Sequence, residues 1–565
     1  MSLITRLHRS PAPEPTSAAD RDRSARRRLP IRTGLAGLLV FAVLAVPDNP
    51  DAFASLRQAL ISLLRLPLEG ILGAAVLLAT PARARRTVAI ALGAALGVLG
   101  ILKVINAGFR EVLGRRFNPV LDWSLLGDGY NYLVETSSRA AAIGAVIGIV
   151  VVSVAAVAVI AVAVRHLAGV TARHHRPARR AVAALVPVWA VLALLSGHTV
   201  VGVPRSSDNV AVLVRNTVLG VPTALADRAK FAELAQADAF RNVPADQLLG
   251  GLRGHDVVIG VVESYGRTAL QDEPMASIVG PALADRQRQL TEAGFSARSA
   301  FLTSSTYGGS SWLAHATFQS GVWIDNPDRY RQLVSGDRLT LTKAFQTAGW
   351  DTVGIEPGNT KAWPEAEFYG YDRVWDARNL GYQGPRFGWS RIPDQFTLGA
   401  FQKHAFAGRQ KPMMAEVSLT SSHTPWPPTP PLVDWNTLGD GTIYGPIAQA
   451  GEQSERAGAP VQVRFAESVV YSIDSLLSWA RTYADDDLVL IVFGDHQPNA
   501  RVSGKGSDHD VPISIIAKDP SVFDKIADWK WHEGLKPGAD APLWKMDAFR
   551  DRFLTAFGTP GGAAR

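Results

Sequence analysis

Long apolar stretches fill the first part of the chain. Five of them cover residues 31–47, 57–80, 87–107, 140–164 and 181–203. A membrane-spanning helix needs ~20 mostly apolar residues, and the range begins at about 17. Further apolar stretches follow the first, and no small-residue cleavage pattern marks its end, which argues against a removable signal peptide. The pattern predicts a helical membrane domain of five spans over residues 31–203.

Arginines beside these stretches predict an orientation. They gather before the first stretch, after the second and after the fourth, whereas the loop after the first carries Asp48 and Asp51. Arginine-rich short loops remain in the cytoplasm, so residues 1–30 are expected to form a basic cytoplasmic tail. An odd number of spans then places everything after Val203 outside the cytoplasm. The net charge of +7 reflects these loops and does not indicate a nucleic-acid partner.

Two polar features of the membrane half carry expectations of their own. Arg65 and Glu69 lie four residues apart in the second stretch, which would place them on one helical face. Ionisable groups at membrane depth usually pair or face a polar cavity, so we expect an ion pair or a lipid head-group site. The loop at 108–138 has the composition of an ordered segment, and we expect it to pack on the soluble domain.

After residue 203 the composition is that of a soluble domain. Residues 204–250 are predicted to form a helical connector, and residues 251–565 are sufficient for one large α/β domain. The chain contains no cysteine. This excludes disulfides, cysteine-ligated zinc and a thiol nucleophile.

Two apolar, β-branched runs predict buried parallel strands. Residues 255–262 form the first run, which ends at Glu263, and residues 488–493 form the second, which leads into Gly494-Asp495-His496. The carboxyl ends of such strands are where open α/β sheets place their ligand sites. The carboxylate of Asp495 and the imidazole of His496 form a donor pair that suits Mn, Mg or Zn. An ordinary turn is the alternative for the Gly-Asp-His segment.

A glycine-rich segment between these strands offers a hydroxyl nucleophile. It runs from Tyr307 through Gly308-Gly309-Ser310-Ser311 into a helical pattern. A serine at a helix start lies beside free N–H groups that favour an oxyanion, although a simple N-cap serine gives the same pattern. Two histidines, His423 and His509, are expected at loop–strand junctions.

Together these segments resemble the sulfatase-like branch of the alkaline phosphatase superfamily, and within it the lipoteichoic acid synthase-type membrane enzymes. The order of Glu263, the glycine-rich hydroxyls, His423, Gly-Asp-His and a histidine before Val-Pro carries the resemblance. It implies a multi-pass helical membrane domain of five spans plus an extracytoplasmic α/β domain with a mostly parallel sheet. The implied localisation is the cell membrane, with a cytoplasmic N-terminus.

The resemblance also implies roles for individual residues. Glu263, Asp495 and His496 would bind a divalent cation, most often Mn or Mg, with Zn as an alternative. Ser311 would be the nucleophile and touch the metal, with Ser310 as the alternative, and His423 would contact the substrate phosphate. The remaining candidates are His509 for a second metal, and Trp363 and Trp312 for substrate binding.

The sequence departs from that family's pattern in two places. A serine stands where these synthases mostly have threonine, and the arginine that accompanies Trp363 in their glycerol-binding region has no counterpart. The sulfatase signature is absent too, because Ser311 is followed by Trp312 and Leu313, which argues against formylglycine chemistry.

The resulting hypothesis is a phosphotransferase or phosphohydrolase, most like a phosphoglycerol transferase. Its expected partners are a phospholipid donor such as phosphatidylglycerol and, as acceptor, a cell-envelope molecule or water. The alternatives are a phosphoethanolamine transferase, whose usual disulfides this chain cannot form, a sulfatase-like hydrolase, and a catalytically inactive envelope sensor.

Overall fold

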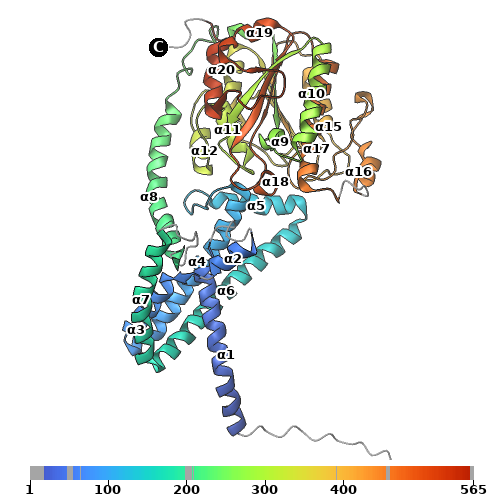
Figure 1. The fold of residues 1–565 in the computed structure, drawn as a ribbon. Helices are drawn as coiled ribbons and strands as arrows, with labels where there is room; N and C mark the ends of the chain where they lie inside the picture. The colour runs from blue at the N-terminus through green and yellow to red at the C-terminus, as the bar shows by residue number, and fades with distance from the viewer. Residues whose placement is uncertain are drawn as a thin grey trace, which may run out of the picture. The chain divides into compact units, whose positions relative to one another are not determined.

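The computed structural model describes residues 18–47, 55–63, 65–197, 206–207, 209–389, 391–452 and 458–559. The chain forms two compact units (Figure 1). The membrane unit comprises residues 1–107 and 147–216, and the catalytic unit comprises residues 108–146 and 217–565. Asp48, Asp51 and the end of the fifth expected span lie outside the described residues.

The membrane unit is helical. Its helices are α1 (Ala18–Ala45), α2 (Leu56–Leu63), α3 (Leu68–Ala79), most of α4 (Ala82–Leu113), most of α6 (Arg139–Arg173), α7 (His175–Gly197) and the start of α8 (Asn209–Gln236). Among the described residues, four helices are long and apolar enough to cross a membrane: α4, α6, α7 and α8. The expected spans at 87–107, 140–164 and 181–203 fall in α4, α6 and α7, and the chain is a membrane protein.

Small residues bring α4 and α6 together. A Cβ on Gly93 would lie 2.6 Å from Ala161 Cα, and one on Gly97 would lie 2.8 Å from Val157 Cα. Real Cβ atoms do not approach a backbone this closely, so only glycine fits at both positions. Close backbone contact through small residues is the way in which helices associate in a bilayer.

The expected span at 57–80 is wrong as a single helix. The chain forms α2, then the short strand β1 (Leu66–Pro67), which pairs with β2 (Ser206–Ser207), and then α3. Pro67 breaks the helix, because proline disfavours a helical conformation at the preceding residue. Arg65 and Glu69 consequently do not share a helical face. Instead, one Glu69 oxygen accepts hydrogen bonds from the first backbone N–H groups of α8, at 2.8 Å from both Val210 and Ala211.

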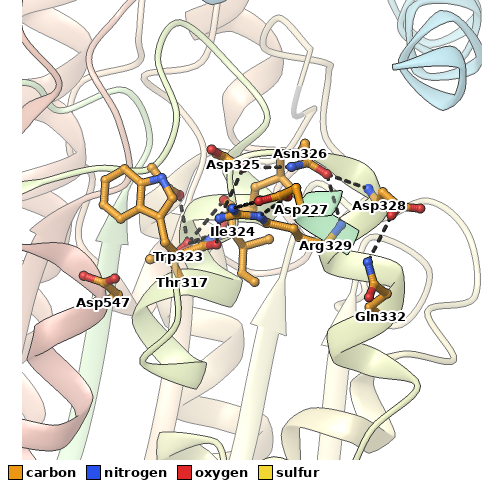
Figure 2. A network of polar contacts seen from close by, with 12 residues as sticks. Asp227, Thr317, Trp323, Ile324, Asp325, Asn326, Asp328, Arg329, Gln332 and Asp547 are labelled. Carbon is orange, nitrogen blue, oxygen red and sulfur yellow. Dashed lines mark hydrogen bonds and ion pairs between the residues drawn. The ribbon is translucent and has the colours of Figure 1, made fainter. Parts of the chain in front are cut away.

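Helix α8 occupies the expected connector, and its length and hydropathy are those of a fourth candidate span. Its second half belongs to the catalytic unit. Asp227 there receives two hydrogen bonds from Arg329 of α12 (Pro327–Val334), at 2.6 and 2.9 Å. Figure 2 shows Arg329 within this network, which also includes the backbone oxygen of Trp323. The end of the connector is therefore fastened to the catalytic unit.

A nine-stranded mixed sheet forms the centre of the catalytic unit in the described part of the chain. Its order is β10-β4-β9-β8-β3-β7-β5-β6, and β11 pairs with β4. Strands β9 and β10 run against the other seven, so the prediction of a mostly parallel sheet is confirmed. The strands are β3 (Asp256–Val262), β4 (Ser296–Thr303), β5 (Asp351–Glu356), β6 (Arg373–Asp376), β7 (Met413–Leu419), β8 (Leu488–Gly494), β9 (Asp510–Ala517), β10 (His532–Glu533) and β11 (Leu543–Lys545).

Helices cover both faces of this sheet (Figure 1). Alternate residues of β3 enter two separate cores, Val258 with α10 and α17 on one face and Val257 with α11 and α20 on the other. This alternation follows from the period of two along a strand. The helices of this unit are α5 (Trp123–Thr136), α9 (Thr268–Gln271), α10 (Ala276–Glu292), α11 (Ser311–Ser320), α12, α13 (Leu341–Ala348), α14 (Ala366–Tyr369), α15 (Asp394–Phe401), α16 (Tyr444–Glu452), α17 (Val461–Tyr483), α18 (Ala500–Ser503), α19 (Pro520–Asp524) and α20 (Phe549–Phe557).

Candidate metal centre and nucleophile

Strand register brings the predicted acidic residues together. Strands β3 and β8 are parallel neighbours, and Val262 pairs with Gly494, the last residue of β8. The next residues along the two strands are Glu263 and Asp495, and His496 follows. Ligand atoms of these three residues lie within 4.8 Å of one another, and all three side chains are buried.

The tautomer of His496 leaves one nitrogen for the site. Its Nδ1 lies 2.8 Å from the backbone oxygen of Gln497, and a carbonyl oxygen can only accept, so Nδ1 carries the proton. In the neutral ring Nε2 then presents a lone pair. This Nε2 lies 3.4 Å from Glu263 Oε1 and 3.6 Å from Asp495 Oδ2. A backbone carbonyl that orients a histidine in this way is typical of metal ligands.

The glycine-rich segment is held against the same strand end. Gly308 N–H donates to the backbone oxygen of Gln497 at 2.9 Å, the oxygen that also fixes His496. Gly308 has φ +71°, and a Cβ there would lie 1.9 Å from Val112 O at the end of α4. Position 308 therefore requires glycine both for its conformation and for this close approach.

The structure brings Ser311 rather than Ser310 into contact with the predicted metal ligands. Ser311 is the first residue of α11, and its Oγ donates to Glu263 Oε2 at 2.8 Å and lies 3.2 Å from His496 Nε2. Ser310 is the N-cap residue with φ +66°, and its side chain makes no capping hydrogen bond.

The donor set fits a divalent cation. One buried oxygen, Asp495 Oδ2, has no hydrogen-bond partner among the described residues, and such an atom is costly unless something binds it. Burial is the largest influence on the pKa of both carboxyl groups. In Glu263 the nearby imidazoles of His496 and His423 and the hydrogen bond from Ser311 outweigh burial and lower the pKa, whereas burial and the charge of Glu263 raise the pKa of Asp495 to about 6. Two carboxylates this close repel each other, and a cation would relieve that repulsion.

His423 lies beside this group, on the loop after β7. Its Nδ1 donates to the backbone oxygen of Thr424 at 2.6 Å, and the ring stacks on Trp389 with centroids 4.1 Å apart. Burial lowers the pKa of His423, although the negative charge of Glu263 opposes it. The ring is therefore neutral near pH 7, and Nε2 is the atom left to accept a proton.

The structure does not bring the other candidates into the cluster of ligand atoms. His509 packs against Tyr307 with the rings tilted and their centroids 5.5 Å apart, and it is outside the group formed by Glu263, Asp495 and His496. Trp312 packs edge-on against Tyr330, and Trp363 packs against two further tyrosines, in one aromatic cluster next to α11.

The structure also shows a second polar group that the sequence did not predict. His315 lies one helical turn after Ser311, and its Nδ1 is 2.9 Å from Glu416 Oε1. Tyr371 donates to the other oxygen of Glu416 at 2.8 Å. Glu356 completes the group, and its ligand atom lies within 4.8 Å of those of the other two. Burial is the largest influence on Glu356 and, with the charge of Glu416, raises its pKa to about 7, although the charge of His315 opposes this shift.

Sequence signals for this second group existed, but each is local and weak. Glu416 is a lone charge within the apolar strand β7, and Glu356 ends β5 as Glu263 follows β3. Glu416 pairs with Gly354 across the sheet, which places it close to the end of β5. Only this strand order and the position of α11 bring them to His315.

No protein-family profile matches this chain, and no curated protein does. Solved structures do show likeness. The lipooligosaccharide phosphoethanolamine transferase A of Neisseria meningitidis is 14% identical, with 92% of this chain and 94% of that chain covered and a TM-score of 0.48. The lipoteichoic acid synthase LtaP of Listeria monocytogenes is 14% identical, with 57% and 78% covered and a TM-score of 0.36.

A third structure is the phosphoglycerol transferase GacH of Streptococcus pyogenes in complex with sn-glycerol-1-phosphate. It is 10% identical, with 58% of this chain and 78% of that chain covered and a TM-score of 0.33. A protein of the alkaline phosphatase superfamily from Vibrio parahaemolyticus is 17% identical, with a TM-score of 0.37. The chemistry proposed below rests on the geometry of Glu263, Ser311, Asp495 and His496 described above.

Proposed function

We propose that this chain is a membrane-anchored, metal-dependent phosphotransferase or phosphohydrolase. It acts outside the cytoplasm on a lipid-linked or cell-envelope phosphoester through a phosphorylated Ser311. The supporting observation is the convergence of Ser311 Oγ, Glu263 and His496 at 2.8 and 3.2 Å, next to Asp495 Oδ2, which has no hydrogen-bond partner among the described residues.

The chemistry needs a cation and a nucleophile at one point. A divalent cation held by Glu263, Asp495 and His496 would lower the pKa of a nearby hydroxyl and screen the phosphate charge. Ser311 sits at the N-terminus of α11, where free N–H groups favour an oxyanion. Its hydrogen bond to Glu263 fixes Oγ and leaves its lone pairs available for attack on phosphorus.

The two halves of the reaction balance in protons. In the first half the bond from Ser311 Oγ to phosphorus forms, the bond to the leaving alcohol breaks, and the serine proton ends on that alcohol. In the second half water or another alcohol attacks phosphorus, and the proton returns to Ser311. His423 can carry this proton, because its Nδ1 is committed to the Thr424 carbonyl and Nε2 is not.

The membrane helices support a lipid-linked donor. The arginine pattern supports an N-terminus in the cytoplasm and a catalytic unit outside. Phosphatidylglycerol is the donor that the sequence resemblance favours, and water or a cell-envelope acceptor completes the reaction. Mn or Mg suits the two carboxylates, and Zn suits the histidine.

Full-length protein reconstituted with acyl-labelled phosphatidylglycerol tests the proposal. We expect release of diacylglycerol that depends on added Mn, and no release from metal-free protein. Matched vesicles containing labelled phosphatidylethanolamine show whether the donor is specific. No release from either lipid with Mn, Mg or Zn would reject phospholipid phosphotransfer, and release that persists in metal-free protein would reject the metal-dependent mechanism.

A further inference from the structure

A short amphipathic helix, α5, lies between two membrane helices in the sequence. α5 follows α4 after nine residues, and only residues 137 and 138 separate it from α6. Both α4 and α6 are long and apolar enough to span a membrane. The covalent connection therefore keeps α5 close in sequence to the end of α4 and to the start of α6.

One face of α5 is fastened to the catalytic unit. Thr360 Oγ1 donates to Glu135 Oε1 at 2.9 Å, and Lys361 Nζ donates to Asn131 Oδ1 at 2.8 Å. On the same face the ring of Tyr132 lies 6.5 Å from the ring of His423. The polar face of α5 is thus part of the wall beside the proposed active site.

The opposite face of α5 is apolar and exposed. Trp123 is 60% exposed and Leu126, three residues later, is 43% exposed. At 100° per residue Tyr130 lies between these two side chains on the same face, whereas Tyr132 and Glu135 lie about 120° or more away from both of them. Large exposed apolar side chains on a short segment next to membrane spans are typical of an interfacial helix, and tryptophan and tyrosine favour the head-group layer.

The turn before α5 holds this face in place. Arg115 makes a bidentate ion pair with the buried Asp122, at 2.7 and 2.8 Å, and Asp122 Oδ2 also accepts from Asn118 N–H. Phe117 is buried and packs edge-on against Trp123, with ring centroids 5.5 Å apart. Trp123 is therefore presented by an ordered turn.

We propose that α5 lies in the head-group layer of the membrane, with Trp123 and Leu126 inserted among lipids. The partner of this surface is the lipid bilayer. Its polar face would then hold the Ser311 site at the lipid surface, where a lipid-linked phosphoester can reach it. This last consequence rests on the proposed function, whereas the insertion itself does not.

The cysteine-free sequence allows a direct test by spin labelling. Leu126→Cys is labelled in the full chain in phospholipid bilayers, with Val150→Cys on α6 as the lipid reference and Ser277→Cys on α10 as the water reference. Both reference positions are exposed. We expect the Leu126 label to collide more with oxygen and less with a water-soluble nickel complex than the Ser277 label. Collision rates equal to those of the Ser277 label would overturn the proposal.

A second measurement connects the surface to turnover. Trp123→Ser combined with Leu126→Ser should lower turnover of a phospholipid in vesicles by about tenfold, because the apolar face no longer inserts. Turnover of a water-soluble short-chain phosphodiester should stay within about twofold. An equal loss on both substrates, or none on either, would overturn the proposal. If the unmodified protein cleaves neither substrate, the proposed function fails, and the spin-label result still decides the insertion.

Discussion

Replacement of Ser311 by alanine removes a single oxygen that makes two contacts. Oγ donates to Glu263 Oε2 at 2.8 Å and lies 3.2 Å from His496 Nε2. A hydrogen bond to a charged group contributes roughly 1.5–3 kcal/mol to stability, so the variant should fold. The covalent route is lost completely. We expect turnover to fall by at least ~10³-fold, which corresponds to about 4 kcal/mol of transition-state stabilisation.

The assay combines turnover with a trap for the phospho-enzyme. Full-length protein is mixed with a diester labelled at phosphorus, quenched in acid and tested for label on the protein. Ser310→Gly is the matched control, because Ser310 has φ +66° and makes no capping bond. Glycine relieves about 1 kcal/mol of backbone strain there but adds unfolded-state entropy of similar size, so stability and label should be unchanged. Label retained by Ser311→Ala, or lost only in Ser310→Gly, would refute the assignment.

Three further outcomes follow from the structure. Added Mn should stabilise metal-free protein by ~2.7 kcal/mol when Mn is at about 100 times its dissociation constant, and Asp495→Asn should abolish that shift in thermal unfolding. Arg550 and its carboxylate partner are both 0% exposed, so Arg550→Met leaves a buried carboxylate without its ion-pair partner. Urea unfolding should show that the free energy of unfolding falls by about 3–5 kcal/mol. For Arg331→Met, where the arginine is more exposed, it should fall by less than about 1 kcal/mol. Burial lowers the pKa of His315, but Glu416 outweighs this and raises it to about 9 from 6.5. The stabilisation of the fold by protonated His315 is therefore complete below pH 6.5 and is lost as the pH rises through 9, up to ~3 kcal/mol in all. The variant His315→Gln should flatten this part of the dependence of the free energy of unfolding on pH.

The sheet and the proximity of the proposed metal ligands were predictable because their signals are local. The strand predicted at 255–262 is β3 at Asp256–Val262, and the strand predicted at 488–493 is β8 at Leu488–Gly494. Continuous β-branched runs identify buried strands, and parallel neighbours end at the same edge. The proximity of Glu263 and Asp495 can therefore be predicted without detailed knowledge of the fold.

Other features depend on contacts that hydropathy does not contain. The high mean hydropathy of residues 57–80 gives no sign that Pro67 breaks the helix. Because of this break, Glu69 contacts the start of α8. The ion pair between His315 and Glu416 joins residues 101 positions apart. Its formation depends on how α11 lies on the sheet, and a lone glutamate in a strand does not specify that.

The segment at 108–138 contacts both sides of the proposed chemistry, which relates the fold to a membrane substrate. On one side, the end of α4 approaches the nucleophile loop so closely that a Cβ at Gly308 would lie 1.9 Å from Val112 O. On the other side, Tyr132 of α5 lies against the ring of His423. A displacement of this segment would therefore move the backbone three residues before Ser311 and the residue proposed to carry the proton. A segment inserted between two membrane helices in the sequence is thereby a structural part of the proposed active site.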